Sequence, residues 1–186
     1  EVMGGISERL IDRCTMIPAS ASQNFTTHAD GQTGMIIHVV QGEREMVSDN
    51  RSLAKFSLKG LPDLPAGVPR IRVSFNVDAD GILTVEAKEE FTGISAGIEA
   101  TPSHGLTDDE IEDMLDAAIE NAEQDVDQRL LIEATIEAQQ VLKALSDSLE
   151  QDREMATEEE IYQMGQVSQA LQQAIEAKER KKISDL

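Results

Sequence analysis

The sequence is poor in aromatic residues, with no Trp, one Tyr and four Phe. Its hydrophobic core must therefore be built from aliphatic side chains. It also has a single cysteine, Cys14, which excludes an internal disulfide bond and suits a reducing compartment. No uninterrupted apolar run reaches the roughly 18 residues that a transmembrane helix needs, so we expect no membrane span.

Positive charge is scarce too. The 186 residues include 36 Asp and Glu but only 16 Lys and Arg, which gives a formal net charge of −20. Proteins that bind nucleic acids or anionic membranes need clustered Lys and Arg to neutralise phosphates. We therefore expect no nucleic acid and no membrane among the partners.

Signs of catalysis or metal binding are also few. The sequence has no P-loop and no GxGxxG after a strand, and no two of its three histidines have metal-ligand spacing. Cys14 lies in an apolar segment and is expected to be a small buried hydrophobe. The sequence pattern predicts that His38 lies on the exposed face of a strand and that His104 lies in a loop. We therefore expect no catalytic residue, no metal site and no enzyme.

The composition changes near residue 102. All five prolines lie at or before that point, together with ten of the twelve glycines and all four Phe. The first 100 residues carry 14 acids and 9 bases, and the remainder carries 22 acids and 7 bases, so the net charge goes from −5 to −15. We predict two domains, an all-β domain over residues 1–104 and a very acidic all-α domain over residues 105–186.

Hydrophobic alternation with a period of two marks the strands of the first domain. It is clearest over residues 35–40, 71–77 and 82–87, with predicted turns at Asp78–Gly81 and Asp30-Gly31. Further strands are predicted at Glu1–Met3, Cys14–Ile17, Gln23–Thr27, Leu53–Leu58 and Gly97–Thr101. The Gly4-Gly5 pair predicts a bulge or a chain reversal. About eight short antiparallel strands make a β-sandwich.

Helical periodicity fills the second domain. Thr107 and Glu110 form a predicted capping box, and apolar residues at three- and four-residue spacing continue to Leu149. We expect this long stretch to bend or break near Gln128–Arg129. Thr157 starts another helix in the same way, and the basic stretch Lys178–Lys182 suits the C-terminus of that helix. The fold class is thus a β-sandwich followed by α-helices.

Several blocks of sequence resemble the substrate-binding half of DnaK-type (seventy-kilodalton heat-shock) chaperones, in that family's order and spacing over roughly residues 1–125. They are Glu1–Gly5, Thr15–Pro18, Ile37–Arg44, Asp49–Leu53, Phe75–Leu83 and Gly105–Ile111. The helices beyond resemble the family's lid in character only. A second set resembles the branch of the family that serves iron–sulfur cluster assembly. This set is Gln23–Thr27, Asp30–Thr33, Ser52–Phe56, Leu64–Gly67 and Glu123–Val126.

The resemblance implies a channel for an extended apolar peptide between the loops of the sandwich, with a helical lid above. Carried over by position, five residues would line its apolar pocket: Phe25, Met35, Ile37, Ile71 and Val73. Two residues, Met3 and His28, would form an arch over the peptide. Three more would offer backbone and polar contacts: Val2, Thr26 and Gln32.

The resemblance also implies a latch that holds the lid by charged contacts. Asp30 is kept, whereas Ala66 and Lys143 stand where the family has an Arg and a His, so Asp30 and Lys143 are the candidate latch. The family's ATP-binding domain is missing from the sequence. We therefore expect a piece of a longer protein, with a shortened lid, that holds no cofactor and does not hydrolyse ATP by itself.

The predicted function is the client-holding part of an ATP-regulated chaperone. The implied partners are an extended apolar client peptide from an iron–sulfur scaffold protein and, through the full-length protein, a J-domain co-chaperone. The implied location is the bacterial cytoplasm, ahead of the mitochondrial matrix. Two alternatives stay open: a general chaperone domain of the same family for unfolded proteins, and a structural β-plus-helix module that self-assembles.

Overall fold

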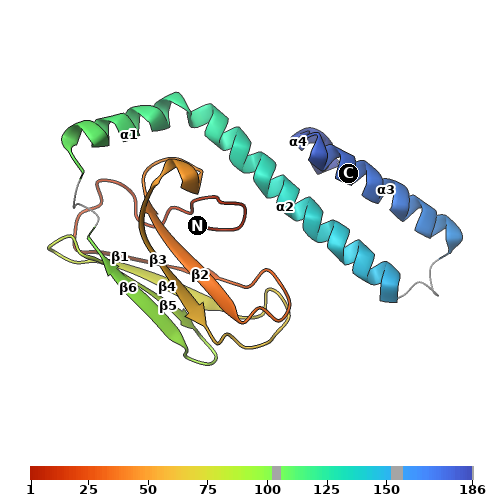
Figure 1. Ribbon diagram of the computed structural model, residues 1–186, viewed down its shortest axis with the longest axis horizontal. Coiled ribbons are helices and arrows are strands. Elements are labelled where there is room, and N and C mark those ends of the chain that lie inside the picture. The colour runs from red at the N-terminus through yellow and green to blue at the C-terminus, as the bar shows by residue number, and fades with distance from the viewer. Residues whose placement is uncertain (102–105, 152–156, 186) are drawn as a thin grey trace. The chain divides into compact units, whose positions relative to one another are not determined.

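The residues that the structure describes fold into six strands followed by four α-helices (Figure 1). The computed structural model describes residues 1–101, 106–151 and 157–185. The strands are β1 (Ala19–Phe25), β2 (Gly34–Gln41), β3 (Arg51–Lys59), β4 (Ile71–Val77), β5 (Leu83–Glu89) and β6 (Ser95–Ala100). The helices are a 3-10 turn, η1 (Val47–Asp49), then α1 (Asp108–Glu120), α2 (Ala122–Gln151), α3 (Glu158–Glu176) and α4 (Arg180–Asp185). The predicted order, β and then α, is confirmed.

The strands form two antiparallel sheets around one apolar core. One sheet has the order β1-β4-β5-β6 and the other pairs β2 with β3. The buried core takes side chains from both sheets and, through Leu61, from the connection between β3 and β4: Ile37, Val39, Leu58, Leu61, Ile71, Val73, Leu83, Val85 and Ala87. The sandwich is therefore closed by aliphatic residues, as the shortage of aromatics required.

Two of the predicted strands are absent, so the estimate of about eight strands was too high. Glu1–Met3 forms only an isolated bridge between Val2 and Ile6, because Gly4 and Gly5, with φ of 85° and 74°, reverse the chain. The segment Cys14–Ile17 is irregular. There, the Thr15 hydroxyl and amide both donate to the carbonyl of Asp12, at 2.7 and 3.3 Å. Such local hydrogen bonds compete with strand pairing.

The predicted hairpin turn at Asp78–Gly81 is confirmed. Gly81 has φ of 80°, and its amide donates to the carbonyl of Asp78 over 3.1 Å. The Asp78 carboxylate accepts hydrogen bonds from the amides of Asp80 and Ile82, both at 2.9 Å. The turn is thus fixed by its own polar groups, and it joins β4 to β5.

The connection from β2 to β3 is organised by one side chain, that of Asn50. Its Nδ2 donates to the carbonyls of Arg44 and Met46, at 2.7 and 2.8 Å, and its Oδ1 accepts from the Arg44 amide at 3.1 Å. A Cβ on Gly42, which has φ of 149°, would overlap Oδ1 of Asn50. The side chain of Asn50 therefore holds the block Asp49–Leu53 in contact with the block Ile37–Arg44.

The first helix begins at the predicted capping box. The Thr107 amide donates to the Glu110 carboxylate at 2.8 Å, and the Glu110 amide donates to the Thr107 hydroxyl at 3.3 Å. The break predicted near Gln128–Arg129 instead occurs at Asn121, between α1 and α2. Asn is among the preferred helix N-cap residues, and the Asp125 amide donates to the Asn121 carbonyl at 2.8 Å.

The chain divides into two compact units, Glu1–Glu120 and Asn121–Leu186. The predicted domain boundary, between residues 104 and 105, lies outside the described residues and stays a prediction, and His104 also lies outside them. In the second unit α2, α3 and α4 pack around their own core of Ala138, Leu171, Ala174 and Ile183.

The turn between α3 and α4 is made by Lys178, a non-glycine residue with φ of 54°. The Glu179 amide donates to the Ala174 carbonyl and the Lys178 amide to the Ile175 carbonyl, both at 3.0 Å. This pair of bonds is a Schellman motif, a helix end that favours glycine at the position of Lys178. The basic stretch predicted at a helix C-terminus therefore begins just beyond α3 and continues into α4.

Candidate peptide-binding site

Three connections meet at one end of the sandwich. The register pairs Phe25, the last residue of β1, with Ile71, the first of β4, and pairs Ile71 with Glu89, the last of β5. The β1–β2 loop (residues 26–33), the β3–β4 loop (residues 60–70) and the β5–β6 turn (residues 90–94) therefore leave the larger sheet at the same end. Most of the sequence-predicted site residues lie on or below these loops.

The five residues predicted to line the apolar pocket belong to one cluster. Ile71, Val73 and Ile37 are core residues, only 0, 3 and 8% exposed, while Phe25 and Met35 pack against them and are half-buried. Phe25 lies directly opposite Ile71. Phe25 and Met35 are thus the members of the set with substantial surface of their own, and the other three support them from below.

Two of the predicted polar contacts are engaged within the protein. The Thr26 hydroxyl donates to the Pro69 carbonyl at 2.8 Å. The Gln32 side chain bridges its own loop, because Oε1 accepts from the His28 amide at 3.2 Å and Nε2 donates to the Gly34 carbonyl at 2.8 Å. The His28 side chain is exposed at this loop. Thr26 and Gln32 therefore shape the loop, and His28 presents its ring to solvent.

The two candidate latch residues lie in different units. The carboxylate of Asp30 accepts a hydrogen bond from the backbone amide of Ala66 at 2.7 Å. Lys143 is an exposed residue of α2, in the second unit. The pairing of Asp30 with Lys143 stays a prediction.

The predicted arch and backbone contacts begin in the N-terminal segment. The Val2 amide donates to the Ile6 carbonyl at 2.8 Å, and the bridge from Ile6 to Met46 joins this segment to the β2–β3 connection. Met3 is 41% exposed at the Gly4-Gly5 reversal. An arch formed by Met3 and His28 stays a prediction.

Sequence reasoning missed the buried acid at the end of β5. Glu89 is fully buried, and one carboxylate oxygen accepts from the amides of Phe91 and Thr92 and from the Thr92 hydroxyl, at 3.0, 2.6 and 2.7 Å. Burial raises the pKa of Glu89, but the hydrogen bonds from Thr92, Phe91 and Arg70 outweigh it and hold the pKa below its ordinary value. The signal was available, because Glu89 continues the inward alternation of β5.

The prediction for Cys14 was wrong. Cys14 is exposed with φ of 61°, not buried. His38 lies on the outward face of β2, as predicted, but its side chain is only 15% exposed. Its Nδ1 lies 2.8 Å from a Glu1 carboxylate oxygen and its Nε2 2.8 Å from the Ser52 hydroxyl. The alternation that put His38 outside the core could not reveal that neighbouring side chains cover it.

Comparison with known proteins decides the family. The family model for Hsp70 protein matches residues 1–186. The chain belongs to the Hsp70 family. It is 50% identical over 183 residues to the chaperone protein HscA of Edwardsiella ictaluri, covering 98% of this chain and 30% of that protein. It is 49% identical over 176 residues to HscA of Yersinia enterocolitica, covering 95% of this chain and 29% of the relative.

A third relative gives the same result. The HscA homologue of Mannheimia succiniciproducens is 51% identical over 161 residues, which cover 87% of this chain and 26% of that protein. This Hsp70 chain thus spans about 30% of the length of the HscA relatives it matches. The resemblance to DnaK-type chaperones is confirmed, and the chain is similar to an HscA-type region that is β first and then α.

One short segment of this Hsp70 sequence matches the nucleophile motif of α/β-hydrolases. Gly93-Ile94-Ser95-Ala96-Gly97 matches the GxSxG pattern, whose serine acts as a nucleophile only on a sharp strand-to-helix turn. Here the motif runs from the β5–β6 turn into β6, with Gly97 so close to Val85 that a Cβ would lie 2.8 Å from its carbonyl oxygen. Gly97 therefore serves sheet packing, Gly93 supplies the positive φ of the turn, at 73°, and Ser95 lacks the setting of a nucleophile.

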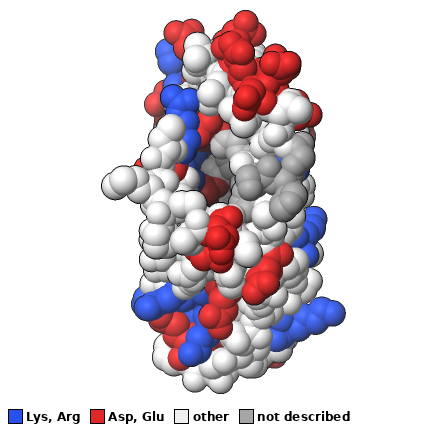
Figure 2. All heavy atoms as spheres, turned by 90° about the vertical axis from the view of Figure 1, so that its left-hand side faces the viewer, with Lys and Arg blue, Asp and Glu red and all other residues white. Residues whose placement is uncertain are grey.

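The surface of the Hsp70 chain is strongly acidic around α1. Figure 2 shows acidic side chains crowded at the top of its view, with a few basic ones at the upper left, and both charge signs mixed lower down. Within α1 the acids are Asp108, Asp109, Glu110, Glu112, Asp113, Asp116 and Glu120, and the helix contains no base. Hydrogen bonds from the Thr107 amide and hydroxyl lower the pKa of Glu110. This surface is unsuited to polyanions.

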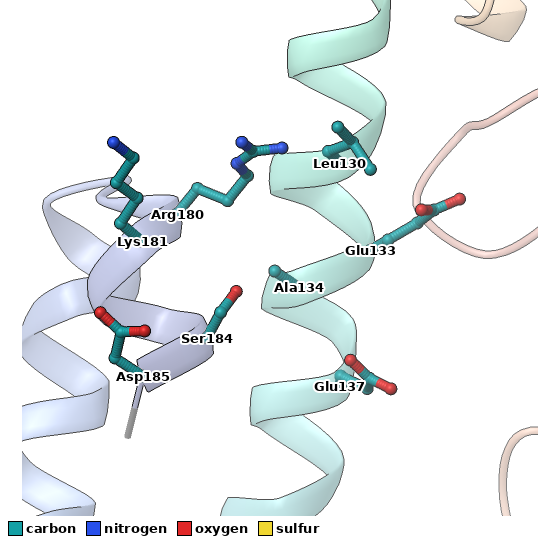
Figure 3. Close-up of a pocket in the computed structure, with 8 residues that line it drawn as sticks. All are labelled: Leu130, Glu133, Ala134, Glu137, Arg180, Lys181, Ser184 and Asp185. Carbon is teal, nitrogen blue, oxygen red and sulfur yellow. The ribbon is translucent and has the colours of Figure 1, made fainter.

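A separate hollow of about 370 Å³ lies between α2 and α4 in the second unit. Leu130 and Ala134 of α2 line it, and Figure 3 shows Arg180 reaching from α4 towards α2, with Ala134 on the facing side and Glu133 and Glu137 pointing away from α4. Because both charge signs line it, the hollow favours no single class of charged ligand.

In the described part of the chain no group of three or more His, Cys, Asp or Glu could hold a metal ion, and none of the helices there is long and apolar enough to cross a membrane.

Proposed function

We propose that this chain is the peptide-binding part of an HscA-type Hsp70 chaperone, and that it holds an extended apolar segment of a client at the loop end of the sandwich. One observation carries the proposal. Phe25 and Met35 flank the β1–β2 loop, are half-buried, and pack against the apolar cluster that contains Ile37, Ile71 and Val73. An apolar side chain seated there would replace the solvent that Phe25 and Met35 now face.

The composition of this surface suits a client of variable sequence. The thioether of Met35 is flexible and adapts to different apolar shapes. Burial of apolar area stabilises a complex by roughly 25 cal/mol per Å². Hydrogen bonds between an extended peptide and the protein backbone add affinity with little dependence on sequence.

We further propose that the client is an iron–sulfur scaffold protein, because segments such as Gln23–Thr27 and Ser52–Phe56 resemble the branch of the family that serves iron–sulfur cluster assembly. A J-domain co-chaperone and ATP are proposed partners of the whole protein. We propose that ATP binds in a part of the whole protein that lies outside this chain. The proposed location is the bacterial cytoplasm, as the relatives are bacterial.

The test is a binding titration with short fluorescent peptides. We expect saturable binding of a seven-residue apolar peptide, and loss of binding when its central residue is changed to Asp. A peptide from an iron–sulfur scaffold protein should bind more tightly than unrelated apolar peptides of equal length. Equal binding of all apolar peptides would favour the general chaperone. Self-association without peptide binding would favour the structural module.

A further inference from the structure

We infer that Asp30 is a positioning residue of the peptide site, whose carboxylate fastens the tip of the β1–β2 loop to the β3–β4 loop. This inference rests on the proposed function. Its basis is the hydrogen bond of 2.7 Å from the Ala66 amide to Oδ1 of Asp30.

The two loops are joined at their bases and again further out. At the base, Phe25 and Ile71 are paired across β1 and β4. Further out, three hydrogen bonds cross between the loops besides that of Asp30. They run from the Thr26 hydroxyl to the Pro69 carbonyl at 2.8 Å, from the Gly67 amide to the Thr27 carbonyl at 3.0 Å, and from the Gly31 amide to the Leu64 carbonyl at 3.1 Å.

Asp30 differs from the other members of this set in its chemistry. It supplies the one ionised acceptor among these four bonds, and hydrogen bonds to ionised acceptors are roughly twice as strong as neutral ones. The loops also approach closely beside it, since a Cβ on Gly31, at φ of 67°, would lie 3.1 Å from Oδ1 of Asp63. Loss of the carboxylate should therefore loosen the loops at the tip while the base pairing remains.

The consequence concerns how fast a peptide leaves. The fastened loops stand at the end of the sandwich where Phe25 and Met35 have their exposed surface. A bound segment can escape more easily when the loops separate. Fastening by Asp30 should therefore slow dissociation without touching the peptide.

This role is distinguishable from a charged latch to Lys143. A latch needs the negative charge of Asp30 and the positive charge of Lys143. A fastened loop needs only a hydrogen-bond acceptor at Oδ1, which Asn also provides. Asp30→Asn separates the two roles, because it removes the charge and keeps the acceptor.

The experiment uses the whole 186-residue chain, with the dissociation rate of a fluorescent apolar heptapeptide and amide exchange at Gly31, Ala66 and Gly67 as readouts. Asp30→Ala should speed dissociation about threefold, because the bond is exposed to solvent and exposed charged contacts are weak, and should speed exchange at all three amides. Asp30→Asn should give both rates intermediate values, clearly slower than those of Asp30→Ala, because its neutral acceptor keeps about half of the strength of the bond. Lys143→Ala should change neither. The matched control Asp63→Ala, which removes a carboxylate from the same pair of loops, should also change neither.

Three outcomes would overturn the inference. One is unchanged amide exchange in Asp30→Ala. Another is unchanged peptide dissociation in Asp30→Ala despite faster exchange. The third is equal acceleration by Asp30→Asn, Asp30→Ala and Lys143→Ala, which would establish the latch. If the wild-type chain binds no peptide, the proposed function fails, and amide exchange alone still decides whether Asp30 fastens the loops.

Discussion

The side chain of Asn50 packs directly against the backbone of Gly42 and fills the space that a side chain on residue 42 would need. A Cβ at Gly42 would overlap Oδ1 of Asn50 and lie 2.9 Å from its Cγ. The same carboxamide makes three hydrogen bonds to the backbone of Arg44 and Met46. The glycine and the asparagine therefore act as one unit in holding the β2–β3 connection.

We expect Gly42→Ala to lower the free energy of unfolding by about 2–4 kcal/mol, because Asn50 must move and lose its hydrogen bonds. Asn50→Ala should lower the free energy of unfolding by about 2–3 kcal/mol, because the same hydrogen bonds are lost. The double variant should cost clearly less than the sum, since only Cβ of Asn50, at 3.3 Å, would then face the new methyl group. Urea unfolding measures all three.

The control for this cycle is Gly81→Ala. Gly81 also has a positive φ, of 80°, but nothing lies within 4 Å of its added Cβ. It should therefore show only the cost of the left-handed backbone, about 1–2 kcal/mol. Additive effects of Gly42→Ala and Asn50→Ala would contradict the shared space.

Met35→Asp should abolish or greatly weaken binding of an apolar peptide, at least tenfold, because it places an unpaired carboxylate in the proposed pocket. The matched variant is Ile36→Asp, on the same strand but 60% exposed on the opposite face. It should bind peptide as the wild type does. Thermal melts of both variants check the fold. Full affinity in a folded Met35→Asp protein would place the pocket elsewhere.

Glu89 should make the stability of the sandwich sensitive to acid. Because its folded-state pKa is lowered from 4.5, its contribution is complete above about pH 4.5 and is lost as the pH falls through the lower folded value. Glu89→Gln should therefore be less stable than the wild type at pH 7, and the difference should shrink towards pH 3.

Unfolding by urea at several pH values measures this difference. The control is Glu86→Gln, which changes an exposed acid on the outward face of the same strand. It should leave the pH dependence of stability near that of the wild type. A stability difference between Glu89→Gln and wild type that is constant from pH 7 to pH 3 would mean that Glu89 acts through packing and not through its charge.

Lys178→Gly should stabilise the second unit by about 1 kcal/mol. A non-glycine residue with left-handed backbone costs roughly 1–2 kcal/mol, of which the greater freedom of glycine in the unfolded chain offsets part. Lys178→Ala removes the same charge and keeps the unfavourable backbone, so it should bring no gain. Equal stability of the two variants would show that the charge of Lys178, and not its φ of 54°, governs this turn.

Whether the structure of a segment could be predicted from the sequence depended on which interactions determine that structure. The alternation over residues 71–77 and 82–87 reflects burial on one face, and the structure contains strands at Ile71–Val77 and Leu83–Glu89. The capping box at Thr107 is local, and it too was predictable. The run from Cys14 to Ile17 is apolar without being buried, and its turn is decided by hydrogen bonds to Asp12.

The site shows the same division. That Phe25, Met35, Ile37, Ile71 and Val73 share one cluster was predictable, because same-face neighbours on paired strands must meet. Which of them keep exposed surface was not, because that depends on the other sheet and on the loops. The partners of Thr26, Gln32 and Asp30 lie up to 43 residues away or inside irregular loops, where no periodicity guides the reading.

The described residues form two apolar cores that have no member in common, one within the strands and one among α2, α3 and α4. Such a chain need not melt as one cooperative body. A calorimetric scan should then resolve two heat-absorption peaks, and a ligand that engages only the folded sandwich should raise the temperature of one peak and leave the other where it was. A single melting temperature would be a poor measure of either a variant or a bound peptide, and each core needs its own probe.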